Sequence, residues 1–258
     1  MRITLIQTDI AWEDKHENLR RLRFRLEELK GETDLVVLPE TFTTGFSMNV
    51  EQLAEPLNSP TIEQLRQWAA QYDTALAGSF IACHNDGTYR NRFFFFTPEG
   101  ETTYYDKRHL FRMGHENECF TAGNERPIIR YRGFRILPQV CYDLRFPVWS
   151  RNVANEYDLA LYVACWPASR RAVWDTLLQA RAMENQCYVC GVNRTGTDGN
   201  HLLHNGGSAL YSPKGERLAS LPDGQEGIVT THIELTPLQH LREKFPVTND
   251  ADSFILQK

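Results

Sequence analysis

The sequence contains no long hydrophobic segment. Its longest apolar runs, such as 159–166, are far shorter than the roughly 20 residues that a helix needs to cross a bilayer. The first residues, 1–7, lack the sustained apolar stretch of a secretory signal peptide, and Asp9 follows them. We therefore expect a cytoplasmic protein that neither spans nor binds a membrane.

Concentrated charge of one sign is also missing. The chain has 28 Lys and Arg against 33 Asp and Glu, a net charge of -5. The densest basic stretch, 20–25, alternates with apolar residues, as on the solvated face of a helix. Nucleic-acid binding requires a concentrated positive surface, so the sequence does not predict a nucleic-acid partner.

Neither a phosphate-binding loop nor a metal-ligand cluster is present. No glycine-rich nucleotide motif follows a strand, and no His/Cys group has the spacing of zinc ligands. The six cysteines are dispersed, which favours reduced thiols. Cys187 and Cys190 lie in a predicted strand, so their side chains should point to opposite faces. We expect no cofactor and no metal.

Short apolar runs alternate with amphipathic segments along all 258 residues. The leucines at 19, 22, 26 and 29 share one helical face, and Ser59 followed by Pro60 is typical of a helix start. Asn85-Asp86-Gly87 indicates a hairpin turn. The predicted strands are 3–7, 34–39, 74–83, 89–97, one ending at Tyr105, 134–141, 159–165, 187–193, 208–211 and 227–235. Helices are predicted over 19–29, from residue 60, over 148–154 and over 173–186, with turns at 98–100, 196–199 and 213–215.

This pattern predicts an α/β sandwich with sheets inside and helices outside. No repeat, linker or change of composition divides the chain. We therefore expect one domain over residues 1–258.

Three predicted strands end at a chemically reactive residue: Glu40, Lys107 and Cys141. Because ligands bind beyond the carboxyl ends of strands in α/β sheets, these side chains could share one pocket. A thiolate attacks an amide carbon, a carboxylate can take the thiol proton, and an ammonium with a backbone N–H can stabilise the resulting oxyanion.

Simpler interpretations stay open for each residue. Cys141 could be a buried hydrophobic residue, Glu40 could cap the next segment, and Lys107 could be a surface charge. A histidine base is another alternative, for which only His109 and His115 lie in a motif-like context.

Three motifs resemble the Glu, Lys and Cys motifs of the nitrilase superfamily, in that order: Leu-Pro-Glu-Thr-Phe at 38–42, Tyr-Asp-Lys-Arg-His-Leu-Phe at 105–111 and Val-Cys-Tyr-Asp-Leu-Arg-Phe-Pro at 140–147. The resemblance extends from Ile3 to about Phe245, and includes Tyr89-Arg90-Asn91 and the segment 116–123. Trp-Pro-Ala-Ser-Arg after residue 165 and Arg-Glu-Lys-Phe-Pro near the C-terminus are similar to bacterial ω-amidases of the YafV type.

The resemblance implies a four-layer α-β-β-α sandwich. It implies that Cys141 is the nucleophile that forms a thioester, Glu40 the general base and Lys107 the group that stabilises the tetrahedral intermediate. Tyr142 would contribute its backbone N–H to the oxyanion hole. Glu116 would be a second, positioning glutamate, with Glu118 as the alternative.

An ω-amidase releases ammonia from the terminal amide of α-ketoglutaramate or α-ketosuccinamate, whose other end is an anionic keto acid. Such an end requires arginine or amide donors. The candidate anchors are Arg145, Arg170 and Arg171, and the candidate wall residues are Phe46, Phe111, Phe146 and Trp166.

The family usually forms dimers through helices, which implies a homodimer here. The segment 174–185 and the tail from Pro237 onward are the expected interface elements. A nitrilase, an N-carbamoyl amino-acid amidohydrolase, an amidase for deaminated glutathione and a non-catalytic ligand-binding protein are the alternative functions.

Overall fold

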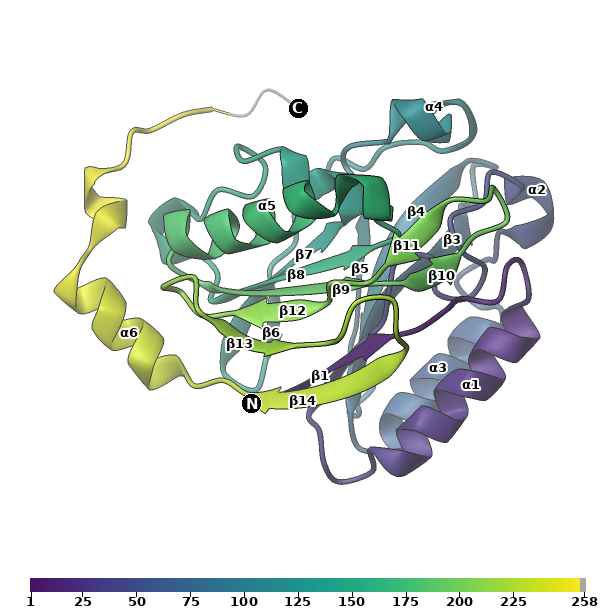
Figure 1. The fold of residues 1–258 in the computed structure, drawn as a ribbon, viewed down its shortest axis with the longest axis horizontal. Coiled ribbons are helices and arrows are strands. Elements are labelled where there is room, and N and C mark those ends of the chain that lie inside the picture. The colour runs from purple at the N-terminus through teal and green to yellow at the C-terminus, as the bar shows by residue number, and fades with distance from the viewer. Residues whose placement is uncertain (256–258) are drawn as a thin grey trace.

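The computed structural model, which describes residues 1–255, contains two large sheets packed face to face (Figure 1). The first sheet has the strand order β14-β1-β2-β3-β4-β5. Its strands are β1 (Arg2–Gln7), β2 (Leu35–Val37), β3 (Ala75–Cys83), β4 (Tyr89–Phe96), β5 (Thr102–Asp106) and β14 (Gly227–His232). Strands β1, β2 and β3 are parallel to one another, and the other neighbouring strands of this sheet are antiparallel.

The second sheet has the order β13-β12-β9-β8-β7-β6. Its strands are β6 (Ile129–Tyr131), β7 (Phe134–Val140), β8 (Leu159–Ala164), β9 (Tyr188–Asn193), β12 (Ala209–Tyr211) and β13 (Arg217–Ser220). The central three, β7 to β9, are parallel. A separate short hairpin consists of β10 (Thr195–Thr197) and β11 (Leu203–Asn205).

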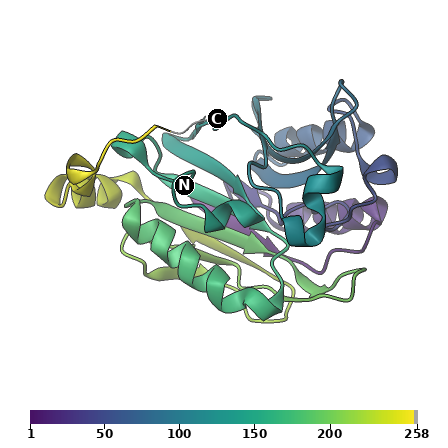
Figure 2. The same cartoon turned by 90° about the horizontal axis from the view of Figure 1, so that it is seen from above.

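Helices cover the outer face of each sheet (Figure 2). Helices α1 (Lys15–Glu28) and α3 (Pro60–Gln71) pack on the first sheet through residues such as Leu26 and Leu65. Helix α5 (Arg171–Glu184) packs on the second through Trp174. The predicted α-β-β-α layering is therefore confirmed.

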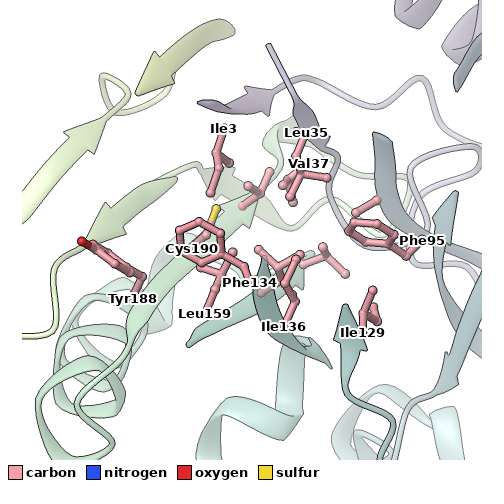
Figure 3. Packing of buried hydrophobic residues seen from close by; sticks show 14 of the residues in the cluster. Ile3, Leu35, Val37, Phe95, Ile129, Phe134, Ile136, Leu159, Tyr188 and Cys190 are labelled. Carbon is pink, nitrogen blue, oxygen red and sulfur yellow. The ribbon is translucent and has the colours of Figure 1, made fainter. Parts of the chain in front are cut away.

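The main core lies between the two sheets. Figure 3 shows side chains of this layer, among them Ile3 and Leu35 from the first sheet and Leu159 from the second. Strand β2 is apolar throughout because both of its faces are covered: Val37 points into the inner core and Val36 toward the helices.

Local signals in the sequence explain where several elements begin and end. The Asp14 side chain accepts a hydrogen bond from the backbone N–H of Glu17 and so caps α1. Ser59 caps α3 in the same way, with Pro60 at its first position. Cys187 and Cys190 lie in different core clusters on the two faces of the second sheet, as the strand interpretation predicted.

The predicted helix over 148–154 is wrong, because this segment consists of turns and a short 3-10 helix (Val153–Asn155). Arg126 donates hydrogen bonds to the backbone carbonyls of Trp149 and Arg151, which a helix would have used internally. Ala154 has a left-handed backbone with φ of 51°, which also interrupts a regular helix.

Two other boundaries differ from the prediction. The expected turn at 196–199 begins later, because Thr195–Thr197 forms β10. The last predicted strand does not reach Leu235, which instead begins the unpredicted helix α6 (Leu235–Lys244). Pro237 lies in the first turn of this helix, where its missing N–H causes no loss of a hydrogen bond. The short helices α2 (Val50–Leu53) and α4 (Glu116–Cys119) were not predicted either.

Candidate active site

A cavity of about 280 Å³ opens beyond the ends of strands from both sheets. Glu40 follows β2, Lys107 follows β5 and Cys141 follows β7, and all three side chains line this cavity. The structure thus brings together the three residues that the sequence analysis expected to share a pocket. The predicted contact residues that also line it are Phe46, Phe111, Tyr142, Arg145, Trp166 and Arg170.

Lys107 is a buried charge rather than a surface one, with only 1% of its side chain exposed. Its Nζ donates to Glu40 Oε1 at 2.8 Å and to Glu116 Oε1 at 3.0 Å. Burial alone would lower the pKa of Lys107, but the negative charges of Glu116 and Glu40 outweigh it and raise that pKa well above its ordinary value. Lys107 therefore stays a cation at neutral pH.

Glu40 is fully buried and its two oxygens have separate partners. Oε1 accepts hydrogen bonds from Lys107 and from Asn91 Nδ2, the latter at 2.7 Å, and Oε2 accepts from the backbone N–H of Cys165 at 2.8 Å. The contact with Cys165 joins the end of β2 in one sheet to the end of β8 in the other. The position of the Glu40 carboxylate therefore depends on both sheets.

Glu116 and Glu118 occupy different environments. The Glu116 side chain is buried, and its Oε2 accepts from the backbone N–H of Phe111 at 2.6 Å. Burial raises the pKa of Glu116 despite the opposing effect of Lys107, and the nearby charge of Glu40 raises it further. Glu118 is exposed and pairs with His115 outside the cavity. Glu116 is therefore the glutamate that contacts Lys107.

Asn91 on β4 is a site residue whose place the sequence analysis did not identify. Its Nδ2 donates to Glu40 Oε1 and also to Glu116 Oε1 at 3.0 Å, so one amide bridges the two carboxylates. Its Oδ1 accepts from Ser79 Oγ, which in turn accepts from the backbone N–H of Thr41. The Tyr-Arg-Asn motif at 89–91 was the only signal for this residue in the sequence.

Cys141 lies at the sharp junction between β7 and a 3-10 helix (Cys141–Arg145). Its φ of 45° is unusual for a non-glycine residue, and the residue as a whole is intermediate between buried and exposed. Burial, followed by the negative charge of Glu40, raises the pKa of the Cys141 thiol well above its ordinary value, although Lys107 opposes this effect. A base is therefore required to remove the thiol proton at neutral pH.

Asp143 fixes this junction against the end of β5. One of its oxygens accepts from the N–H of Val140 and from the Tyr105 hydroxyl, at 3.0 and 2.8 Å. The other accepts from the backbone N–H of His109 and contacts His109 Nδ1 at 2.7 Å. Since Tyr105 and His109 flank Lys107 in the sequence, Asp143 sets the position of the cysteine relative to the lysine.

Neither histidine that was weighed as a base lies in the cavity. His109 is held by Asp143 and stacks on Phe146, with 3.7 Å between the ring centroids. His115 is exposed. Phe146 is therefore not a cavity wall residue as predicted, because its ring covers His109.

Arg145 and Arg170 are the two candidate anchors that reach the cavity. Their guanidinium groups lie over the rings of Trp166 and Phe111, at 5.2 and 5.1 Å from the centroids. Within residues 1–255 neither forms an ion pair shorter than 4.0 Å. Arg171 instead pairs with Asp175 and Asp223, both at 2.8 Å, and does not line the cavity.

The part of the chain that the structure describes contains no group of three or more His, Cys, Asp or Glu side chains arranged to hold a metal ion. Over residues 1–255, no helix has both the length and the apolar character of a membrane span.

Comparisons with known proteins identify the family of this chain. The family described as carbon–nitrogen hydrolase matches residues 2–243. The ω-amidase YafV of Yersinia enterocolitica is 47% identical over 99% of this chain and 98% of its own length. A 2-oxoglutaramate amidase of Bacillus subtilis is 31% identical over 96% of each chain.

A solved structure shows the same fold. XC1258 from Xanthomonas campestris, described as a CN-hydrolase superfamily protein with an arsenic adduct in its active site, superimposes with a TM-score of 0.97. It is 43% identical, and the match covers 100% of this chain and 99% of the other.

Proposed function

Because this chain belongs to the carbon–nitrogen hydrolase family, and so hydrolyses amides, we propose that it is an ω-amidase that acts on α-keto acid ω-amides. Its substrates are α-ketoglutaramate and α-ketosuccinamate, and its products are the dicarboxylic keto acid and ammonia. The relatives named ω-amidase YafV and 2-oxoglutaramate amidase support this substrate class.

The acylation half of the reaction begins when Glu40 accepts the Cys141 thiol proton and Sγ attacks the terminal amide carbon. The tetrahedral oxyanion is stabilised by the Lys107 ammonium and by the backbone N–H of Tyr142. Glu40 then gives its proton to the amide nitrogen, the carbon–nitrogen bond breaks, and ammonia leaves. The acyl group remains on Cys141 as a thioester.

Water completes the cycle. Glu40 takes a proton from the attacking water, a second tetrahedral oxyanion forms on the same donors, and the thioester bond breaks. The proton returns to the Cys141 sulfur and the free acid leaves. Glu116 does not exchange a proton in this scheme, because it holds the Lys107 ammonium in position through its 3.0 Å contact.

Substrate binding uses the positive charge of two arginines in the cavity wall. Arg145 and Arg170 line the cavity, and neither has a carboxylate partner among residues 1–255, so the anionic keto-acid end can bind to them. Phe46, Phe111 and Trp166 supply the apolar walls. A small anion with an uncharged amide at its other end matches this arrangement.

The observation that supports the proposal most strongly is the buried chain of contacts from Glu116 through Lys107 to Glu40 beside Cys141. Burying three ionisable groups together is unfavourable unless they are mutually paired, and such clusters occur at functional sites. A merely ligand-binding protein would not require them.

We also propose a homodimer in the cytoplasm. The buried side of α5 packs inside the chain, but Met183 near its end is 53% exposed. Helix α6 lies at the edge of the molecule (Figure 1), and Phe245 after it is 64% exposed.

The proposed location follows from the cysteines. Since all six are free thiols, a reducing compartment suits them. Analytical ultracentrifugation tests the dimer, and cell fractionation tests the location.

The test of the function is ammonia release from a substrate panel: α-ketoglutaramate, succinamate, glutamine, an N-carbamoyl amino acid, a simple nitrile and deaminated glutathione. We expect α-ketoglutaramate to be turned over best, and Cys141→Ala to abolish the reaction. A Cys141-dependent preference for another compound would reassign the substrate. Turnover that persists in Cys141→Ala would refute the mechanism.

A further inference from the structure

Asn91 is a buried amide that contacts all three charged groups of the site. The residue is only 1% exposed, and its Nδ2 donates to Oε1 of Glu40 at 2.7 Å and to Oε1 of Glu116 at 3.0 Å. Its backbone carbonyl accepts from the backbone N–H of Lys107 at 3.0 Å. The scheme above gives this residue no role.

The orientation of the Asn91 amide follows from its neighbours. The hydroxyl oxygen of Ser79 accepts from the backbone N–H of Thr41 at 2.7 Å and lies 3.0 Å from Asn91 Oδ1. Because Oδ1 can only accept, the Ser79 hydroxyl donates its proton to it, and the amide NH2 faces the two carboxylates. Thr41 directly follows Glu40. The amide that contacts the Glu40 side chain is therefore held through the backbone next to Glu40.

Two buried carboxylates share a single ammonium here and need a further donor. Glu40 and Glu116 both accept from Lys107 through Oε1. Burial raises the pKa of Glu116, and the hydrogen bond from Asn91 is among the contacts that lower it. A donated hydrogen bond favours the charged form of a carboxylate, and an amide provides it without adding a charge. Asn91 therefore stabilises both carboxylates and leaves the net charge of the site unchanged.

We propose that Asn91 is a positioning residue of the catalytic site: its amide holds the Glu40 carboxylate in place and ready to accept the Cys141 proton, and it holds Glu116 against Lys107. This inference rests on the proposed function, in which Glu40 is the general base. It deepens that function by naming the group that keeps the base unprotonated. Asn91 does not line the cavity, so it acts through the two glutamates and not on the substrate.

The titratable groups that face Glu40 come from four other parts of the fold. They are Lys107 after β5, Glu116 on α4, and the thiols of Cys141 after β7 and Cys165 after β8. Burial raises the pKa of both thiols, that of Cys165 to about 12, and the two glutamates raise the pKa of Lys107 despite its burial. Below neutral pH, the members of this cluster that change charge are therefore the two glutamates.

Two substitutions remove the amide donor and keep the backbone contact with Lys107. Asn91→Asp preserves the shape of the side chain but places a third carboxylate against Glu40 and Glu116. Asn91→Ser removes both donated hydrogen bonds and adds no charge. Asn85→Asp is the matched control, because Asn85 is exposed in the turn before β4 and does not line the cavity.

The measurement is the pH profile of kcat/KM for α-ketoglutaramate between about pH 4.5 and pH 9. A carboxylate that loses a donor or gains a negative neighbour is protonated at higher pH, so the acid limb should move upward by roughly one pH unit or more in Asn91→Asp and by less in Asn91→Ser. At the wild-type optimum, kcat of Asn91→Asp should fall roughly tenfold or more, because the base is then protonated in most molecules. KM should stay within about threefold of wild type. The profile of Asn85→Asp should coincide with that of wild type.

The midpoint of the acid limb does not depend on how much of a variant is correctly folded. A purely structural role for Asn91 would lower the amount of active enzyme and leave this midpoint unchanged. A wild-type midpoint in Asn91→Ser would overturn the proposal, because this variant loses the donor and gains no charge. An unshifted Asn91→Asp would also overturn it, and if one variant does not fold, the other decides.

Failure of the ω-amidase function is distinguishable from failure of this inference. In that case the wild-type protein would release ammonia from another amide of the panel rather than from α-ketoglutaramate. The same pH profiles, measured on that amide, would then test the role of Asn91.

Discussion

The ammonium of Lys107 lies 2.8 Å from the carboxylate of Glu40, although both side chains are withdrawn from solvent. The two groups come from the ends of β5 and β2, which are not neighbours in their sheet. Their contact therefore requires the whole sheet to be folded. Because water does not solvate either group, each charge is stabilised by the opposite charge of the other.

Replacing Lys107 by Met should lower both stability and activity. The substitution leaves Glu40 and Glu116 buried without a cation, a change that costs about 3 to 5 kcal/mol when one partner of a buried pair is removed. Urea unfolding followed by circular dichroism measures the stability. An unfolding midpoint equal to wild type would show that the carboxylates do not depend on Lys107.

The two neighbouring glutamates provide a matched pair. Glu116→Gln should lower kcat by roughly tenfold to a thousandfold, because Lys107 loses one of its two charged partners and the oxyanion loses a fixed donor. Glu118→Gln should have no measurable effect, since Glu118 is exposed and lies outside the cavity. Equal kcat values for the two variants would contradict the positioning role.

The arginines allow a similar comparison. Arg145→Gln and Arg170→Gln should each raise KM for α-ketoglutaramate by roughly tenfold, the effect of losing a hydrogen bond to a charged group. Arg171→Gln should leave KM near the wild-type value, because Arg171 is already paired with Asp175 and Asp223. Steady-state kinetics on the three variants tests the assignment, and a rise in KM confined to Arg171→Gln would reverse it.

The pH dependence of thiol alkylation tests the environment of Cys141. Burial and Glu40 raise the pKa of this thiol, so its alkylation by iodoacetamide should still be increasing at pH 9 without a plateau. Glu40→Gln removes a negative charge that disfavours the thiolate, so the profile should move to lower pH. Peptide mass spectrometry separates Cys141 from the other partly exposed thiols, Cys83 and Cys119. A plateau below pH 8 in the wild type would mean a preformed thiolate.

Much of the fold could be predicted from the sequence because its elements carry strong local signals. The apolar run before Pro39, the cap at Ser59 and the turn at Asn85-Asp86-Gly87 each specify structure within a few residues. The region 148–154 could not be predicted in this way. Its backbone carbonyls are satisfied by Arg126, more than twenty residues earlier in the chain.

The site also shows this difference between local sequence signals and contacts made by distant residues. Glu40, Lys107 and Cys141 could be predicted to share one pocket because each ends a strand within a motif. Asn91 and Asp143 were missed because their roles arise only when separate strands are folded together. Asn91, for example, bridges the carboxylates of Glu40 and Glu116, which are 76 residues apart in the sequence.

The central claim is that Cys141 forms a thioester with the acyl part of a keto-acid ω-amide. The most direct measurement is peptide mass spectrometry of protein mixed with α-ketoglutaramate and quenched in acid within the first turnovers. We predict a 2-oxoglutaryl adduct on the peptide that contains Cys141, together with release of one ammonia per adduct, and neither in Cys141→Ser. Ammonia release in the first turnover with no adduct on Cys141, or an adduct on another residue, would contradict the account.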